Sequence, residues 1–230
     1  MSDRQDEAKS SGPIESRTWP KELTAHAVDD GSARRLHGYD VEQDLARFYR
    51  FSDVLYLSLA GDLPDDVQSR AFEVALTFAS VMSVGSAPVH ASVLARLCGC
   101  RTGGVVAVGA LTMGEHVDAL VHGIGEILEG TGPLPEELRA KTNEERASVA
   151  RLAAATAGLP IPALGWDPSL DVALVAVLRA AGLTSVFQVV SALTLGKMPS
   201  ALAEAQTTKP ADFLSYPMDT PHFEYVPPGK

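Results

Sequence analysis

Two neighbouring segments, residues 89–97 and 104–111, consist almost entirely of small or apolar residues and carry one full charge, Arg96. Small residues on every side suit helices that are buried all round or packed closely against a partner chain. Elsewhere apolar residues also recur at helical intervals, and no convincing strand pair, internal repeat or Gly-rich phosphate loop is present. The sequence therefore predicts an all-α fold with these two segments at its centre.

Further helices are predicted on both sides of this centre. Apolar periodicity and breaks at Gly and Pro set their approximate bounds, and Asp65 and Asp66 place acidic charge in the first turn of one of them, where it complements the helix dipole. Short helical signals continue from Pro199. The predicted helices lie at residues 40–59 (two short ones), 65–78, 116–128, 135–157, 170–181 and 183–195.

The 230 residues, 46% of them hydrophobic, are enough for one large core. We predict a single helical domain over residues 17–230. Residues 1–16 are polar and aperiodic, which is typical of a disordered tail. Residues 215–230 are rich in proline and are predicted to form an extended C-terminal tail.

The net charge of -10 repels nucleic acid and anionic membranes, so neither is predicted as a partner. The N-terminal residues do not resemble a secretory signal and no segment is predicted to span a membrane, which favours a cytoplasmic location. Cys98 and Cys100 are interpreted as small core residues in a reducing compartment. The six histidines are scattered, so no metal site is predicted.

Two elements resemble a known superfamily. Residues 36–41 read Leu-His-Gly-Tyr-Asp-Val, and residues 51–64 read Phe-Ser-Asp-Val-Leu-Tyr-Leu-Ser-Leu-Ala-Gly-Asp-Leu-Pro. They resemble the R-G-Y-x-I-E-E-L and F-x-E-V-x-Y-L-L-L-x-G-E-L-P elements that open citrate synthases. Residues 95–114 and 224–228 are similar to elements of the short, citryl-CoA lyase branch.

The resemblance implies an all-helical citrate-synthase-like fold, a homodimer, and a small-molecule substrate. Enzymes of this superfamily bind an acyl-CoA, remove a proton next to the thioester with an aspartate, and polarise two carbonyls with histidines. The CoA thioester is a substrate, so no separate cofactor is expected. By the same resemblance, Arg96 is a candidate for binding substrate.

The chain differs from the superfamily at each of its catalytic sequence motifs. The Asp-His pair before Pro-Ser is absent, and His90, two residues past Pro88, is either a replacement imidazole or a hydrogen-bonded core histidine. His116 fits the oxyanion histidine at the start of the next helix, with Asp118 close by, or is an exposed polar residue at a helix start. Trp166 stands where the second carbonyl-polarising histidine is expected, and indole cannot shuttle a proton.

The catalytic aspartate of the superfamily is also missing. Ser185 or Gln188 takes its place, depending on register, and neither is a useful base at neutral pH. Asp167 is the nearest acid that could substitute, although Asp-Pro at a helix start is commonly only a cap.

Three functions remain open. The first is a rewired enzyme that makes or breaks a carbon–carbon bond in an acyl-CoA or polycarboxylate, using His116, His90 and either Asp118 or Asp167. The second is a catalytically inactive homologue that serves as a ligand-binding or regulatory partner. The third is a specialised-metabolism enzyme whose pocket is made more apolar by Trp166, Phe187 and Val117. Residues predicted to bind substrate are Trp166, Ser185, Gln188 and Arg96.

Overall fold

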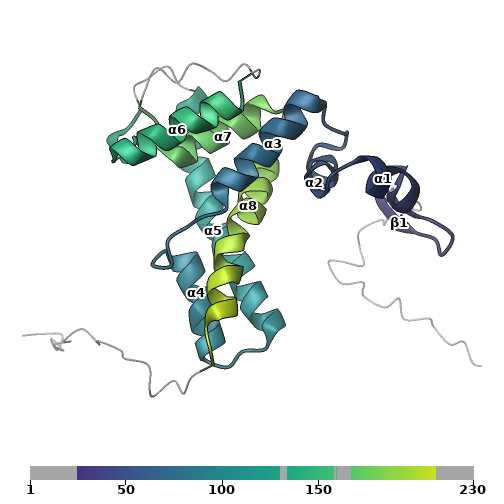
Figure 1. Cartoon of the computed structure of the whole chain (residues 1–230), viewed down its shortest axis with the longest axis horizontal. Coiled ribbons are helices and arrows are strands. Elements are labelled where there is room, and N and C mark those ends of the chain that lie inside the picture. Colours follow the sequence, from purple (N-terminus) through teal and green to yellow (C-terminus); the bar gives the residue numbers. More distant parts are fainter. Residues whose placement is uncertain (1–24, 130–133, 158, 160–166, 211–230) are drawn as a thin grey trace, which may run out of the picture. The chain divides into compact units, whose positions relative to one another are not determined.

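The computed structural model describes residues 25–129, 134–157, 159 and 167–210 (Figure 1). The predicted tails, residues 1–16 and 215–230, lie outside these ranges, as does Trp166. The chain divides into two compact units, residues 1–48 and 49–230. A single domain over residues 17–230 stays a prediction.

The first unit contains a small antiparallel sheet in the order β1-β2-β3, from strands Ala27–Asp29, Arg34–Leu36 and Tyr39–Asp40. A π-helical turn, Val41–Leu45, and the short helix α1, Ala46–Phe48, follow. The expectation that no strands pair was wrong. Strands of two or three residues, mostly exposed, show no alternation of apolar and polar residues from which a sheet could be predicted.

The turns of this sheet explain its register. Asp30 accepts hydrogen bonds from the Ser32 hydroxyl and from the backbone N–H groups of Ala33 and Ser32, which lower its pKa to about 2. Between β2 and β3 the chain turns at His37 and Gly38, with φ angles of 49° and 89°. Such consecutive left-handed residues form the tight turn that matches the twist of a hairpin.

The regular elements of the second unit are all helices within the described residues, apart from two isolated β-bridges, which confirms the predicted all-α class. Acidic N-caps and first turns begin several of its helices, as at Asp65, whose side chain accepts from the N–H groups of Val67 and Gln68. The helices are α2 (Phe51–Ala60), α3 (Asp66–Ala79), α4 (Ala87–Leu97), α5 (Thr102–Glu129), α6 (Asn143–Ala155), α7 (Leu170–Ala180) and α8 (Val186–Thr207), with a 3-10 turn at Glu136–Leu138.

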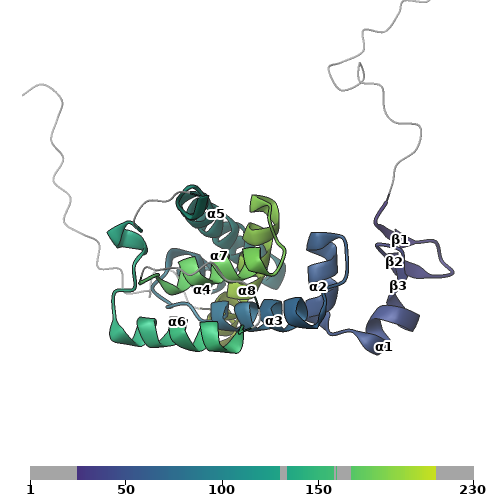
Figure 2. The same cartoon turned by 90° about the horizontal axis from the view of Figure 1, so that it is seen from above.

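Helices α4, α5 and α8 pack against one another, while α3, α6 and α7 pack together around the other end of α8 and α5 (Figures 1 and 2). The two small-residue segments lie in α4 and the first part of α5, but their predicted place at the centre of the fold was wrong, because only Val105 and Gly109 of residues 104–111 are buried. At their crossing, a Cβ on Gly109 would lie 2.4 Å from the Ser92 hydroxyl oxygen. Only glycine allows this approach.

Two helices are longer than predicted. The segments at residues 104–111 and 116–128 are one continuous helix, α5, and α8 continues through Pro199 to Thr207. Proline inside a helix removes one hydrogen bond. Next to it, the Ser200 hydroxyl donates to Ser80 O and accepts from Met82 N–H, which ties α8 to the segment after α3.

The core is built around α7, in which seven consecutive residues, from Val172 to Leu178, are buried. Neighbouring elements cover all of its sides, because α3, α5, α6 and α8 each contact it. This matches its sequence, which is apolar around the whole helix.

Two described helices, Thr102–Ile124 and Val186–Thr207, are long and apolar enough to cross a membrane by length and composition alone. Core helices of soluble proteins meet the same criterion. Here the two helices pack against each other, and 28% and 39% of their apolar stretches, respectively, are buried within the structure.

The interpretation of Cys98 and Cys100 as core residues was wrong. Both thiols are exposed, in the turn between α4 and α5. Their small apolar neighbours belong to the flanking helices, whereas the turn itself projects beyond the packed surfaces.

Candidate functional site

The antiparallel pair α4 and α5 carries the two candidate catalytic histidines. His90 is half-buried in the first turn of α4, and His116 is exposed in the middle of α5. Gly109 stands opposite Ser92, so His90 is level with residue 111 of α5, five positions before His116. At the rise of an α-helix this is roughly 7.5 Å along the pair. Neither imidazole has a hydrogen-bond partner within the described part of the chain.

The predicted position of His116 at a helix start was wrong, because α5 begins at Thr102. An interior residue cannot combine its side chain with free backbone N–H groups to hold an oxyanion. Any polarisation of a carbonyl by His116 therefore depends on its imidazole alone.

Asp118 lies on a different side of α5 from His116. Residues two apart on a helix are separated by about 200° and do not face each other. Asp118 instead pairs with His122, whose Nδ1 is 3.4 Å from the carboxylate and 2.9 Å from the backbone oxygen of Asp118. His122 was not among the predicted site residues, although its i,i+4 spacing from Asp118 is a sequence signal for this contact.

Asp167 is held by structural partners. Its carboxylate accepts from the Arg146 guanidinium, and its backbone oxygen accepts from Ala140 N–H at 2.9 Å. Arg146 also bonds Ala140 O and the side chain of Asn143. This arrangement ties the start of α6 to the segment before α7, so the carboxylate has a structural partner.

Ser185 and Gln188 form the capping box of α8. The Ser185 hydroxyl accepts from Gln188 N–H at 3.2 Å, and the Gln188 side-chain oxygen accepts from Ser185 N–H at 2.9 Å. The Gln188 amide also donates to Leu59 O at 3.0 Å. Both side chains thus have a structural role at the helix start.

Arg96 lines a small cavity of about 90 Å³ between α4, α5 and α8. Its Nε donates to Thr208 O at 3.4 Å, near the end of α8. Apolar and amide side chains complete the wall, and the other candidate site residues do not line this cavity. The two remaining apolar candidates point elsewhere, since Val117 is fully buried in the core and Phe187 is 74% exposed.

A larger groove of about 420 Å³ lies between α2, α3 and α8. Thr77 and Ser80 donate their hydroxyls to backbone oxygens of α3, so these walls present mainly carbon to a ligand. Its lining contains no ionisable side chain and none of the predicted site residues. The lining residues are Phe51, Ser52, Leu55, Leu76, Thr77, Ser80, Leu195, Gly196 and Pro199.

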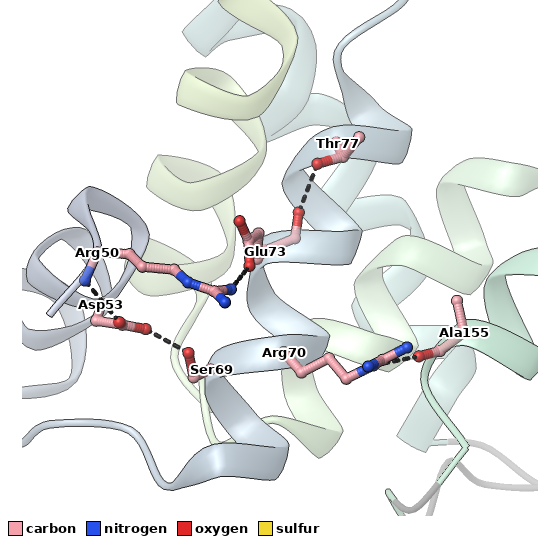
Figure 3. A network of polar contacts seen from close by, with 7 residues as sticks. All are labelled: Arg50, Asp53, Ser69, Arg70, Glu73, Thr77 and Ala155. Carbon is pink, nitrogen blue, oxygen red and sulfur yellow. Dashed lines mark hydrogen bonds and ion pairs between the residues drawn. The ribbon is translucent and has the colours of Figure 1, made fainter.

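A polar network holds α2 against α3 beside this groove (Figure 3). Asp53, which is 7% exposed, accepts from Arg50 N–H at 2.9 Å and from the Ser69 hydroxyl. Arg50 pairs with Glu73. The network satisfies the buried carboxylate fully, so its role is to position α2.

The structure does not gather the predicted site residues around one cavity, and no group of three or more His, Cys, Asp or Glu suited to a metal occurs among the described residues. The pair that sequence reasoning missed is Lys197 and Asp171, joined at 2.8 Å, with the lysine side chain only 6% exposed. No sequence signal reveals such a pair, because its members are 26 residues apart and on different helices.

Comparison with known structures identifies the fold. Citryl-CoA lyase from Hydrogenobacter thermophilus superposes with a TM-score of 0.67 and 19% identity, covering 93% of this chain and 97% of that one. This chain has the citryl-CoA lyase fold. No family model matches the sequence, and no curated protein matches it.

Two larger proteins contain the same citryl-CoA lyase fold. ATP citrate lyase from Methanosaeta concilii, as the D541A mutant with (3S)-citryl-CoA, aligns at a TM-score of 0.64 and 14% identity. ATP citrate lyase from Methanothrix soehngenii, with citrate and coenzyme A, aligns at 0.61 and 10% identity. This chain covers 43% and 46% of their lengths.

Proposed function

We propose that this protein is a divergent enzyme of the citryl-CoA lyase type, which makes or breaks a carbon–carbon bond in an acyl-CoA or polycarboxylate substrate. The observation that carries the proposal is the likeness to citryl-CoA lyase over 97% of that chain. Fold alone does not fix a reaction. The proposal therefore also draws on His90 and His116, two imidazoles on adjoining helices that have no hydrogen-bond partner among the described residues.

Two imidazoles are enough for cleavage of a citryl-type thioester. His90 takes the proton of the tertiary hydroxyl, the carbon–carbon bonding pair moves into the thioester as an enolate, and His116 donates a hydrogen bond to the enolate oxygen. The proton held by His90 then passes to the enolate carbon. Asp118 and Asp167 have no place in this scheme, because one faces away from His116 and the other is paired with Arg146.

Binding is the first test of this proposal. The thermal midpoint of the full chain is measured alone and with CoA, acetyl-CoA and citryl-CoA. A ligand at about 100 times its dissociation constant stabilises the folded state by roughly 2.7 kcal/mol. We expect citryl-CoA to raise the midpoint, and no shift with any thioester would contradict the proposal.

Turnover is the second test, with a matched pair of variants on the same helix. His116→Ala should lower citryl-CoA cleavage by about 10²-fold or more, as expected for loss of an oxyanion donor. His122→Ala removes an exposed imidazole six residues away and should leave cleavage unchanged. Equal activity of both variants would exclude His116 from the reaction.

A second candidate function, an inactive homologue that binds a ligand or a partner enzyme, is favoured by a specific observation. Three residues at candidate catalytic or binding positions, Asp167, Ser185 and Gln188, are engaged in ion pairs and caps. This account expects thioester binding without cleavage. Cleavage by pure protein that is lost in His116→Ala would exclude it.

We also propose that the protein is a homodimer, paired through α5. The first half of this helix exposes small residues at Gly103, Ala107 and Ala110, with Gly114 half-buried in line with them. A Cβ on Gly103 or Gly114 would meet no atom within 4 Å. A second helix can therefore approach this side of α5 closely, and a second copy supplies a matching surface by symmetry.

A further inference from the structure

The turn between α4 and α5 carries two free thiols that the proposed chemistry does not use. Cys98 and Cys100 are both exposed and are separated by Gly99 alone. Gly99 has a φ of 74°, in the left-handed region. Backbone hydrogen bonds from Gly99 N–H to Arg96 O and from Cys100 N–H to Ala95 O close the turn as a Schellman motif.

This turn brings the two cysteines within reach of each other. When the middle of three residues is helical, or the mirror image of helical, the outer Cα atoms lie about 5.5 Å apart. That separation is inside the range of about 4.4–6.8 Å found for disulfides. An extended chain would place the same residues near 7 Å, about the limit for a disulfide. Gly99 is thus what makes a bridge possible at so short a spacing.

The stretch of sequence that carries the thiols is positively charged, in contrast to the chain as a whole. Residues 74–114 contain no Asp or Glu, while Arg96 and Arg101 flank the two cysteines. The Arg101 side chain is exposed and the Arg96 side chain is half-buried. An anionic oxidant such as glutathione disulfide is attracted to such a patch.

We propose that Cys98 and Cys100 form a redox-active dithiol that is oxidised to an internal disulfide by small anionic disulfides. One cysteine thiolate attacks a sulfur of glutathione disulfide and releases one glutathione thiolate. The second cysteine thiolate attacks the protein sulfur of the mixed disulfide and releases the other glutathione. Two electrons and two protons leave the protein, and one glutathione disulfide becomes two glutathione thiols.

The test follows the full-length protein in glutathione buffers, with quenching by acid, alkylation and intact-mass measurement. We expect the wild type to pass to a species about 2 Da lighter that takes up no alkylating reagent. Cys98→Ser and Cys100→Ser should each accumulate a stable mixed disulfide with glutathione. Arg101→Gln should slow the first attack several-fold at low salt and have little effect at high salt.

Three outcomes would overturn the proposal. They are a wild type that accumulates mixed disulfides on both sulfurs, covalent dimers as the main oxidised product, and no oxidation at any glutathione ratio. Catalytic activity does not enter the readout, so the result is independent of the proposed carbon–carbon chemistry.

Discussion

At the scale of single residues, the ion pair of Lys197 and Asp171 joins α8 to the first turn of α7. The lysine side chain is 6% exposed and the aspartate side chain 35%. Removing one member leaves the other charge behind, and the cost depends on how deeply that charge is buried. Removal of the aspartate and removal of the lysine should therefore lower the free energy of unfolding by unequal amounts.

We expect Asp171→Ala to lower the free energy of unfolding by about 3 kcal/mol, because it leaves a buried ammonium without its partner. Lys197→Met should cost about 1 kcal/mol or less, since the thioether fills most of the volume and the carboxylate can turn toward water. Urea unfolding of both variants checks the order. A larger loss for Lys197→Met would contradict the assignment of Lys197 as the buried partner.

Tyr56 is a second residue whose burial has a measurable consequence. Burial raises the pKa of its phenol above the ordinary 10.0, with a further contribution from the nearby charge of Asp65. The folded state favours the neutral form, so this stabilisation is present below pH 10 and is lost as the pH rises through the raised pKa. Tyr56 also donates to Ala181 O at 2.7 Å.

Tyr56→Phe should therefore cost about 1 kcal/mol at pH 8, through the lost hydrogen bond. The difference in unfolding free energy between wild type and variant should narrow as the pH rises past 10. The wild type then loses stability, because its phenol ionises more readily in the unfolded state, whereas phenylalanine does not titrate. Denaturant unfolding at a series of alkaline pH values measures this gap. A gap that stays constant would show that the phenol does not titrate in this way.

At the scale of elements, the crossing of α4 and α5 depends on one glycine and one hydroxyl. A Cβ on Gly109 would lie 2.4 Å from Ser92 Oγ. That oxygen is buried and has no hydrogen-bond partner in the described part of the chain. A double-mutant cycle can separate the two contributions to packing.

Gly109→Ala alone should destabilise by about 1–3 kcal/mol through overpacking. Ser92→Ala should be neutral or slightly stabilising, because it removes a buried polar atom that has no partner. In the double variant the alanine at position 109 should be tolerated. Thermal unfolding of the four proteins gives the coupling, and purely additive effects would contradict this account of the crossing.

Much of this element structure could be predicted from the sequence. Acidic caps such as Asp65 and the apolar period of residues 170–181 fixed the helices and their approximate bounds. The small β-sheet could not be predicted, because its strands are too short for alternation. The continuity of α5 and of α8 past Pro199 was missed because local breakers were weighed without the packing that overrides them.

The candidate site was less predictable than the fold. The positions of His90, His116 and Asp118 came from matching motifs along the chain, which carries no information on which side of a helix a residue faces. Only the continuous helix α5 shows that the side chains of His116 and Asp118 lie on different sides of the same helix. Local patterns suggested a cap role for Asp167, but the N-cap of α7 is Ser169, and Asp167 instead pairs with Arg146. Ser185 and Gln188 form the capping box of α8.

At the scale of the whole molecule, the proposed dimer can be tested on α5. Ala107→Arg and Ala110→Arg place a long charged side chain on the small-residue side of the helix and should convert the dimer to a monomer. Glu115→Arg, on the exposed part of α5 beyond that stretch, is the matched control and should leave the dimer intact. Sedimentation equilibrium distinguishes monomer from dimer, and a monomeric wild type would refute the proposal.

The most direct measurement for the central claim is the release of keto acid and acetyl-CoA from citryl-CoA by the purified full chain, with His116→Ala and His122→Ala side by side. The account expects measurable cleavage by the wild type, a loss of about 10²-fold or more in His116→Ala, and wild-type activity in His122→Ala. No cleavage by the wild type, or equal activity of all three proteins, would contradict a citryl-CoA lyase-type reaction that uses His116.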